Sequence, residues 1–285
     1  MPRTLNFKQE LTGAFGSPIA ENPTQVMIEA AYRHLGLNWR YLTIEVAKDA
    51  LADAVRGARA MGFRGFNCTI PHKVAVIQHL DGLGESASVM GAVNCVVRRG
   101  DELIGENTDG RGFLDAVRSL GDPRGKRVVV FGAGGAARAI AVELALAGAV
   151  SFVVVNRSEA RGTELVGLLV ERVKADARLV VLRQDFEVPD ATDIVVNATS
   201  VGLFPDANAR LALDISTLKA GMIVADVIPN PPRTRLVRDA EQRGCKVIDG
   251  LAMLVNQGAI GVEHWTGILP DPAVMRRALE DVFAG

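Results

Sequence analysis

The stretch "RVVVFGAGGAARAIAVELALAG", residues 127–148, is the part of this sequence that decides its fold. A run of apolar residues ends at Phe131, a glycine-rich turn follows, and an alanine-rich helical pattern begins at once. Gly132 permits a tight turn, and Gly134 lets backbone N–H groups approach a pyrophosphate at the start of the helix. Ala137 occupies the third glycine position of the GxGxxG fingerprint, which tolerates alanine. Because strand, turn and helix follow in the required order, the stretch predicts a dinucleotide-binding Rossmann domain.

The end of the next expected strand indicates which dinucleotide binds. Proteins that read the ribose 2′-hydroxyl of NAD usually carry Asp or Glu there, about 20 residues after the glycines. This chain has "VVVNRSEAR" at 153–161 instead. Arg157 can stack on adenine and pair with a 2′-phosphate, and Arg161 lies one turn further on. We therefore expect NADP(H), with NAD(H) as the alternative if both arginines are ordinary surface charges.

Short apolar runs alternate with helical patterns along the whole chain, which is typical of an α/β fold. The expected elements of the first part are strands at 11–15, 40–46 and 63–70, a hairpin at 92–107, and helices at 23–36, 48–62 and 109–121. Apolar runs such as "SFVVVN" and "TDIVVNATS" predict parallel strands buried on both faces. The two last helices are expected at 251–267 and 271–283.

These patterns predict two domains. We expect an N-terminal α/β substrate domain over residues 1–110, completed by the C-terminal helices of 251–285, and a doubly wound Rossmann domain over 111–250. The turn-rich "GDPRGK" at 121–126 is the most evident joint in the chain.

Composition excludes several classes of function. The chain has 285 residues, of which 48% are hydrophobic and 23% charged, and a formal net charge of −1 without charged blocks. This balance argues against nucleic acid or a membrane surface as a partner. No apolar run reaches the length of about 18 residues that a membrane span needs, and the start has no signal-peptide core. Three cysteines without a CxxC pair, and four histidines without ligand-like spacing, predict a reducing cytoplasm and no metal site.

Three polar clusters in the first part stand among apolar neighbours. "NCTIPHK" (67–73) places Asn67 and Thr69 at the end of a strand and Lys73 at a helix start, where the helix dipole disfavours a cation. "GAVN" (91–94) places Asn94 within an expected strand, where asparagine is rare. "GENTDGRGF" (105–113) places Asp109 at a strand-to-helix junction, where Thr108 or Asp109 also suits a helix cap. Each residue alone reads as structural, but together they suggest a Lys–Asp pair with amides that hold hydroxyl groups.

At this point the chain resembles the shikimate dehydrogenase family over nearly its whole length. The matching blocks, in family order, are "NCTIPHK", "GAVN", "GENTDGRGF", "GAGGAARA", "NRSEAR", "NATSVG", "D…P…T.L" (226–236) and "GLAMLVNQGA…WTG" (250–267). The resemblance implies a substrate domain beside an NADP-binding Rossmann domain. It also implies reversible hydride transfer between NADP and a cyclic secondary alcohol or ketone, and a place in aromatic amino acid biosynthesis. The expected partner is a small cyclic hydroxy compound, and the expected assembly is a monomer or homodimer.

The resemblance also assigns roles to residues. Lys73 and Asp109 match the catalytic pair, and a lysine coupled to a carboxylate can take and return the hydroxyl proton. The positions that hydrogen-bond ring hydroxyls in the family match Asn67, Asn94 and Gln257, and Thr69 lies beside them. We also expect Glu21 and Asn22 among the substrate-binding residues. The cofactor-binding matches are Gly132, Ala133, Gly134, Gly135, Ala136, Asn156, Arg157, Ser158, Arg161, Thr199, Ser200, Val227 and Gly250. Which member of the Lys–Asp pair is formally the base stays open.

The chain departs from the family pattern at the stretch "GSPIAENPTQ", residues 16–25. The family has a sequence such as G-N-P-I-x-H-S-x-S-P there, and its two serines bind the substrate carboxylate. This chain is shorter and has Glu21 and Asn22 instead, and Pro229 stands where the family has a tyrosine that also reaches the carboxylate. If Glu21 faced the pocket about 4 Å from a carboxylate, repulsion would cost about 4 kcal/mol at an effective dielectric near 20. Asn22, Pro23 and Gln25 also predict a helix start with a capping box.

We therefore expect a substrate that lacks a carboxylate or carries hydroxyl or amino groups in its place, such as a cyclic polyol, an amino-substituted shikimate analogue or a quinate-like compound. One alternative is a true shikimate dehydrogenase, which reduces 3-dehydroshikimate with NADPH and holds the carboxylate by other groups. A second alternative is a non-catalytic NADP-sensing module, and a third is another reductase on the same fold, such as a folate-type methylene dehydrogenase.

Overall fold

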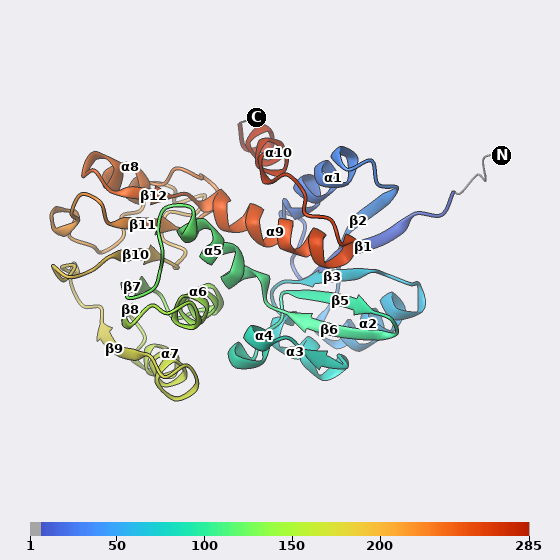
Figure 1. Cartoon of the computed structure of the whole chain (residues 1–285), viewed down its shortest axis with the longest axis horizontal. Coiled ribbons are helices and arrows are strands. Elements are labelled where there is room, and N and C mark those ends of the chain that lie inside the picture. The colour runs from blue at the N-terminus through green and yellow to red at the C-terminus, as the bar shows by residue number, and fades with distance from the viewer. Residues whose placement is uncertain (1–6, 285) are drawn as a thin grey trace. The chain divides into compact units, whose positions relative to one another are not determined.

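The structure is a computed structural model that describes residues 7–284. It divides into two compact units, which are drawn together in Figure 1. The first unit contains the chain up to Thr108 and again from Gly258 onward, and the second contains Asp109–Gln257. The C-terminal segment therefore belongs to the same unit as the N-terminal part of the chain.

The first unit is built on a mixed six-stranded sheet with the order β2-β1-β3-β5-β6-β4. Its strands are β1 (Glu10–Gly16), β2 (Trp39–Glu45), β3 (Gly65–Cys68), β4 (Gly82–Leu83), β5 (Cys95–Arg99) and β6 (Glu102–Glu106). β1 runs parallel to both of its neighbours, whereas β5 is antiparallel to β3 and to β6. The three parallel strands end together, so the residues that follow them lie at one edge of the sheet.

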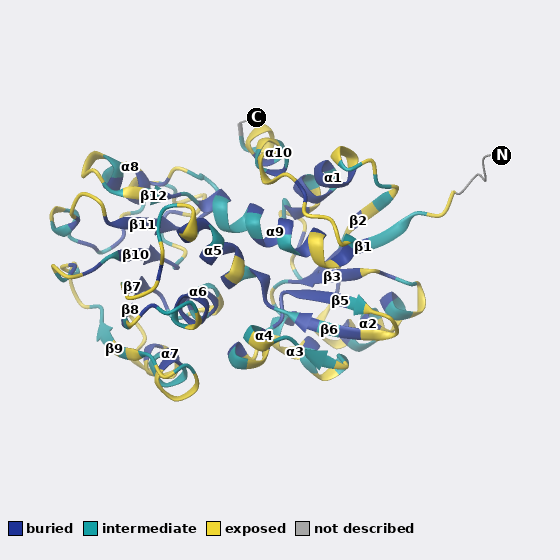
Figure 2. Ribbon diagram, viewed as in Figure 1, coloured by how far each residue is buried: buried dark blue, intermediate teal, exposed yellow. Residues whose placement is uncertain are grey.

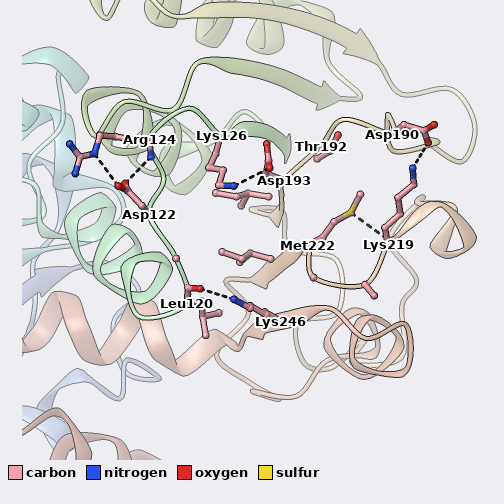
Figure 3. A pocket seen from close by; sticks show the side chains of 15 residues that line it. Leu120, Asp122, Arg124, Lys126, Asp190, Thr192, Asp193, Lys219, Met222 and Lys246 are labelled. Atoms are coloured by element: carbon pink, nitrogen blue, oxygen red, sulfur yellow. Dashed lines mark hydrogen bonds and ion pairs between the residues drawn. The ribbon is translucent and has the colours of Figure 1, made fainter.

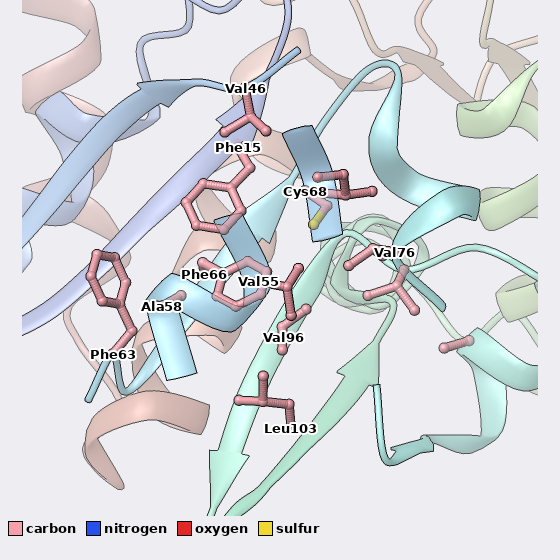
Figure 4. Close-up of a cluster of buried hydrophobic side chains, with 13 residues drawn as sticks. Phe15, Val46, Val55, Ala58, Phe63, Phe66, Cys68, Val76, Val96 and Leu103 are labelled. Atoms are coloured by element: carbon pink, nitrogen blue, oxygen red, sulfur yellow. The ribbon is translucent and has the colours of Figure 1, made fainter. Parts of the chain in front are cut away.

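Helices and 3₁₀ turns cover the two faces of this sheet. They are α1 (Thr24–His34), η1 (Lys48–Ala50), α2 (Leu51–Ala60), α3 (His72–Ala75), η2 (Val76–His79), α4 (Glu85–Met90) and α10 (Pro272–Ala284), with the C-terminal part of α9 (Gly250–Thr266). One face carries a cluster of buried side chains in which the rings of Phe15 and Phe66 stack with centroids 4.5 Å apart (Figure 4). α2 closes this cluster with Leu51 and Val55.

The other face carries α1 and the end of α9. The indole N–H of Trp265 donates to the Val96 carbonyl at 3.0 Å, so α9 is fixed to the sheet by a polar contact. Gly65 makes this approach feasible, because a Cβ on it would collide with the Val96 oxygen and the Trp265 ring. Tyr32 on α1 and Tyr41 on β2 are both fully buried there.

The second unit is an all-parallel six-stranded sheet with the order β12-β11-β10-β7-β8-β9. Its strands are β7 (Arg127–Phe131), β8 (Ser151–Asn156), β9 (Asp176–Val181), β10 (Ile194–Asn197), β11 (Ile223–Asp226) and β12 (Lys246–Ile248). Its other elements are α5 (Thr108–Arg118), α6 (Gly135–Leu146), α7 (Glu159–Arg172), η3 (Ile215–Thr217) and α8 (Arg235–Gln242). Read from β9, this is the doubly wound strand order 3-2-1-4-5-6 of a Rossmann domain.

Burial explains the apolar character of these strands. Every residue of β10 and β11 is buried, whereas β9 at the sheet edge is only partly covered, and Figure 2 shows the same contrast. Strands in the middle of a parallel sheet have helices on both faces, so their sequences are apolar throughout. The predicted α/β class with a Rossmann domain is thus confirmed.

Some sequence-based expectations need correction. The turn-rich segment 121–126 lies within the second unit, and the chain passes between units at Thr108–Asp109. Asn94 is not inside a strand but directly precedes β5, although its backbone still pairs with Cys68 and Glu106. The capping box is also wrong, because the Gln25 side chain accepts a hydrogen bond from Thr43.

Candidate functional site

The carboxyl edge of the second sheet begins with the glycine turn after β7. Gly132 has a φ of +105°, and a Cβ there would lie 2.8 Å from the Ala198 carbonyl oxygen. Only glycine suits this position, since the conformation is strained for other residues and the neighbouring strand leaves no space. The turn is therefore fixed by the backbone of the loop after β10.

The start of α6 is open in a way that suits a phosphate group. Gly134 is the N-cap and has no side-chain capping bond, and α6 has no acidic residue in its first turn. A Cβ on Gly134 or Gly135 would meet nothing within 4 Å. Ala133 and Ala136, half-buried, flank these two glycines. Backbone N–H groups at the positive end of a helix dipole thus face open space, which fits a pyrophosphate.

The loop after β8 presents two arginines. Arg157 and Arg161 are exposed, and Ser158 caps α7 by accepting the Arg161 backbone N–H at 3.5 Å. Asn156 donates from its side chain to the Ser158 carbonyl at 2.7 Å, which shapes the loop. An amide therefore stands where NAD-selective proteins place a carboxylate, and two guanidinium groups follow it.

A buried network holds the loops after β10 and β11. The Asn197 side chain accepts the Thr199 hydroxyl at 2.7 Å and donates to Asp226 at 3.1 Å. Asp226 in turn accepts the Thr234 hydroxyl at 2.7 Å, and burial raises the pKa of its carboxyl group. This network fixes Thr199 close to the end of β10.

The remaining predicted cofactor residues lie on or beside these loops. The Val227 N–H donates to the Asn197 carbonyl at 3.1 Å, and Ser200 is exposed beside Thr199. Gly250 opens α9, and a Cβ on it would collide with the Ile228 carbonyl oxygen. Gly250 is thus required for close packing after β11, whatever it contributes to a ligand.

Asn67 and Asn94 form a polar cluster in the first unit, where both are buried. Asn67 accepts the Tyr41 hydroxyl at 2.7 Å and donates to the Asn94 carbonyl at 3.0 Å. Asn94 accepts the Thr108 backbone N–H at 2.7 Å and donates to the Thr108 hydroxyl at 3.0 Å. The two amides predicted from separate motifs are therefore neighbours, joined through one carbonyl group.

Backbone contacts fix the segment from Thr69 to Lys73. The Thr69 N–H donates to Phe15 at 3.0 Å, and its carbonyl accepts the His72 N–H at 2.7 Å. His72 is buried with its ring nitrogen 2.7 Å from the Val46 carbonyl, which is a structural role. Lys73 is half-buried, and its carbonyl accepts the Val93 N–H at 2.7 Å, which ties it to the segment before Asn94.

The divergent stretch 16–25 lies at the same edge of this sheet. Gly16 ends β1 so close to Thr69 that a Cβ on it would collide with the Thr69 methyl group. Asn22 accepts the Thr24 N–H at 2.9 Å at the start of α1, one residue later than predicted. Glu21 is exposed. A carboxylate therefore stands free in the loop that carries serines in the family pattern.

Asp109 and Gln257 belong to the second unit, where α5 and α9 pack closely. A Cβ on Gly112 would lie 2.5 Å from the backbone nitrogen of Gln257. The side-chain amide of Asn256 donates to the Gly112 carbonyl at 3.0 Å. Gln257 is buried and donates to the Leu254 carbonyl at 3.0 Å. Asp109 is half-buried in the first turn of α5.

A hollow of about 640 Å³ lies elsewhere, at the amino ends of the parallel strands (Figure 3). Its cations are already engaged: Lys126 pairs with Asp193 at 3.2 Å, Lys219 pairs with Asp190 at 2.8 Å, and the Lys246 ammonium donates to the Leu120 carbonyl at 2.9 Å. Ligands of open parallel sheets bind at the carboxyl ends of the strands. This hollow is therefore not the candidate site.

Sequence reasoning missed several residues that shape the site. Tyr41 bonds Asn67, Asn197 bonds Thr199, and Asp226 bonds Asn197, yet no role was assigned to any of the three from the sequence. Each of them is a polar residue within an apolar strand, and this is the feature by which the sequence could have indicated them. Burying a polar group costs free energy unless the group forms a hydrogen bond. Within residues 7–284, no helix is long and apolar enough to cross a membrane, and no cluster of three metal-ligand side chains occurs.

Comparison with known proteins decides the family. Three family models match the chain: the shikimate dehydrogenase substrate binding domain at residues 14–96, shikimate / quinate 5-dehydrogenase at 115–229, and the shikimate 5′-dehydrogenase C-terminal domain at 250–280. The chain belongs to the shikimate dehydrogenase family. The expected class, an oxidoreductase acting on CH–OH groups, is thereby confirmed.

Individual relatives cover nearly all of the chain. The shikimate dehydrogenase (NADP(+)) of Methanopyrus kandleri is 41% identical over 281 residues, which is 97% of each chain. The ligand-free 5-ketofructose reductase of Gluconobacter sp. strain CHM43 is 51% identical, with a TM-score of 0.95 over 98% of this chain and 100% of that one. A shikimate dehydrogenase in complex with NADP⁺ is 33% identical, with a TM-score of 0.90 over 98% of each chain.

Proposed function

We propose that this protein is an NADPH-dependent reductase of a polyhydroxy ketone without a carboxylate, with 5-ketofructose as the substrate. The observation that carries the proposal is the 51% identity to a 5-ketofructose reductase over 98% of this chain. The identity to the shikimate dehydrogenase of Methanopyrus kandleri is lower, at 41% over a similar length.

The divergent loop supports this choice of substrate independently. Two serines and a tyrosine, which in the family pattern grip a carboxylate, are absent, and Glu21 stands exposed in the shortened loop. A neutral sugar has no carboxylate, so it loses no contact through these changes. It is also not repelled by the Glu21 carboxylate. The amides of Asn67 and Asn94 can bind its hydroxyl groups, since hydroxyls accept and donate hydrogen bonds.

The described residues fit NADPH as the cofactor. The open N-terminus of α6 suits the pyrophosphate, and Arg157 and Arg161 suit the 2′-phosphate. Asn156 in place of a carboxylate removes the group that reads a free 2′-hydroxyl. Thr199 and Val227, held by the Asn197 network, would line the rest of the site.

The chemistry is a balanced two-electron reduction. NADPH, when bound, supplies the hydride that adds to the carbonyl carbon. We assign delivery of the proton to the new alkoxide oxygen to Lys73, coupled to Asp109, and the reverse direction returns that proton to the pair. Asn67, Asn94 and Gln257 hold the flanking hydroxyl groups, so that the ketone is presented in one orientation.

Shikimate dehydrogenase activity is the second candidate, because relatives with that name match 94–98% of this chain. It would require other groups to hold the carboxylate. Substitution Glu21→Gln tests whether this residue opposes a carboxylate: at a separation of about 4 Å in water, removal of the charge gains about 1 kcal/mol, or about fivefold in binding, and a shikimate dehydrogenase that holds the carboxylate elsewhere would show no gain. We expect that gain for 3-dehydroshikimate and none for 5-ketofructose, with the exposed Glu102→Gln as the control.

The proposal is tested by following NADPH oxidation with 5-ketofructose and identifying the product. We expect turnover in the wild type and a loss of about 10²- to 10⁴-fold in kcat for Lys73→Ala, the range for removal of a general acid. The exposed Lys48→Ala should keep full activity. Absence of turnover with 5-ketofructose in the folded wild-type protein overturns the proposal.

A further inference from the structure

Tyr41 makes an unusual contact within the first sheet. It lies on β2, while its hydrogen-bond partner Asn67 lies on β3, and β1 separates these two strands. Neighbouring strands are about 4.8 Å apart, so the phenol must reach across the whole width of β1. The β1 residue in register with Asn67 is Ala14, whose small side chain takes little space in that path. A tyrosine is long enough to do this, and its ring is fully buried.

The orientation of the Asn67 amide follows from its two partners. The Asn94 carbonyl can only accept, so it must face the Asn67 NH₂ group, which lies 3.0 Å away. A flipped amide would bring two oxygens together. The Asn67 oxygen therefore faces the Tyr41 hydroxyl, which donates to it at 2.7 Å. The Asn67 oxygen thus accepts from Tyr41, and one N–H of the Asn67 amide donates to the Asn94 carbonyl. The second N–H of this amide takes part in neither bond.

We infer that Tyr41 is a positioning residue, which holds Asn67 so that this amide offers a substrate oxygen an N–H donor. The inference rests on the proposed function in one respect, namely that Asn67 contacts the substrate. Tyr41 itself is buried and acts through Asn67.

The same logic applies to Asn94 and extends the inference to specificity. Its oxygen must face the Thr108 backbone N–H, which can only donate and lies 2.7 Å away. Its NH₂ group donates one hydrogen to the Thr108 hydroxyl at 3.0 Å. Both amides are thus held as donors, and both select hydroxyl or keto oxygens. A protonated amine has donors only, so it would meet a donor at each amide. This argues against the amino-substituted substrates considered from the sequence.

The alternative is that the Tyr41 hydroxyl serves only stability, and the chain offers a matched control. Tyr32 is also buried on this face of the sheet, and its hydroxyl bonds the Thr12 hydroxyl at 2.8 Å. Substitutions Tyr41→Phe and Tyr32→Phe each remove one buried hydroxyl and one hydrogen bond. Only the first releases Asn67.

Both variants are assayed with NADPH and either 5-ketofructose or 3-dehydroshikimate, together with thermal unfolding. Loss of one positioning bond predicts a KM about 3- to 10-fold higher for Tyr41→Phe, with a smaller change in kcat. Tyr32→Phe should show a similar loss of stability and an unchanged KM. Equal KM values for the two variants, or an unchanged KM for Tyr41→Phe, overturn the inference.

A second readout needs no substrate, so failure of the proposed function remains distinguishable. In ¹⁵N-labelled protein, the side-chain N–H signals of Asn67, assigned by their absence in Asn67→Asp, report whether the amide is held. We expect hydrogen exchange of these protons to be at least about 3- to 10-fold faster in Tyr41→Phe and unchanged in Tyr32→Phe. Unchanged exchange in Tyr41→Phe contradicts the positioning role, whichever substrate the enzyme reduces.

Discussion

Asn94 and Thr108 are joined by two hydrogen bonds, with the Asn94 oxygen 2.7 Å from the Thr108 backbone nitrogen and the Asn94 amide nitrogen 3.0 Å from the Thr108 hydroxyl. This contact links the residue before β5 to the first residue of α5, and Asp109 comes directly after it. One amide therefore both presents a donor and fixes the backbone that leads to Asp109. Its substitution should affect the site more than the fold.

The first prediction concerns Asn94→Asp. The new carboxylate still accepts the Thr108 N–H, but it loses the donor and is buried without a cation among its described partners. A substrate oxygen that is left without this donor in the complex costs about 1–3 kcal/mol, so kcat/KM should fall by about 10- to 100-fold. Steady-state kinetics test this, with the exposed Asn38→Asp as the control. Undiminished activity of Asn94→Asp would show that its donor is not used.

The second prediction concerns the 2′-phosphate. Substitution Arg157→Ala together with Arg161→Ala removes both exposed guanidinium groups after β8. Hydrogen bonds to charged groups are worth about 1.5–3 kcal/mol, so the KM for NADPH should rise by about 10- to 150-fold. The KM for NADH should rise much less, because NADH loses only the adenine stacking of Arg157 and has no 2′-phosphate. Arg172→Ala, at the far end of α7, should change neither value. A parallel rise for both cofactors would contradict the assignment.

The third prediction separates two glycines of one turn. Gly132→Ala places a Cβ at a φ of +105° and 2.8 Å from the Ala198 oxygen, so it should destabilise the protein by about 1–3 kcal/mol. Gly134→Ala meets nothing within 4 Å, so the fold should keep its stability. The new methyl group would instead block the pyrophosphate. Thermal unfolding should therefore show a loss of stability for Gly132→Ala, and NADPH fluorescence titration should show weaker binding for Gly134→Ala. A loss of stability in Gly134→Ala would contradict this prediction.

The fourth prediction follows from the thiols. Burial raises the pKa of Cys68 to about 12, whereas Cys245 is half-buried. At pH 8 about one Cys68 thiol in 10⁴ is ionised, so iodoacetamide should label Cys245 well before Cys68. The unfolded thiol ionises near 9.0, so stability should fall as the pH rises from about 9 towards 12. Mass spectrometry of labelled peptides measures the order, and early labelling of Cys68 would contradict its burial.

The Rossmann unit could be predicted well from the sequence, because glycines, apolar strands and helix starts are local signals. The turn-rich segment 121–126 was less informative, because its turn residues mark the end of α5, whereas the chain passes between units at Thr108–Asp109, close to the expected limit at residue 110. The capping role of Gln25 failed for a similar reason. Its side chain bonds Thr43, a partner that becomes adjacent only when β2 forms.

The candidate site shows the same division. Asn67 and Asn94 were predicted from separate motifs, but their contact depends on the register of β3 against β5. Tyr41 was not predicted, because its contact crosses an intervening strand and leaves no trace in the local pattern. Asn197 and Asp226 lie in the quoted blocks "NATSVG" and "D…P…T.L", but their bond to each other depends on the pairing of β10 with β11 and could not be predicted from either block. Polar residues within apolar strands are therefore the sequence feature that best indicates such buried hydrogen-bond networks.

The most direct test of the central claim is the ratio of kcat/KM for 5-ketofructose to kcat/KM for 3-dehydroshikimate, measured with NADPH. The missing serine pair and tyrosine each remove a bond to a carboxylate, worth about 1.5–3 kcal/mol apiece. The account predicts a ratio that favours 5-ketofructose by at least about 100-fold. A ratio at or below one would contradict it and would identify the chain as a shikimate dehydrogenase with a different carboxylate site.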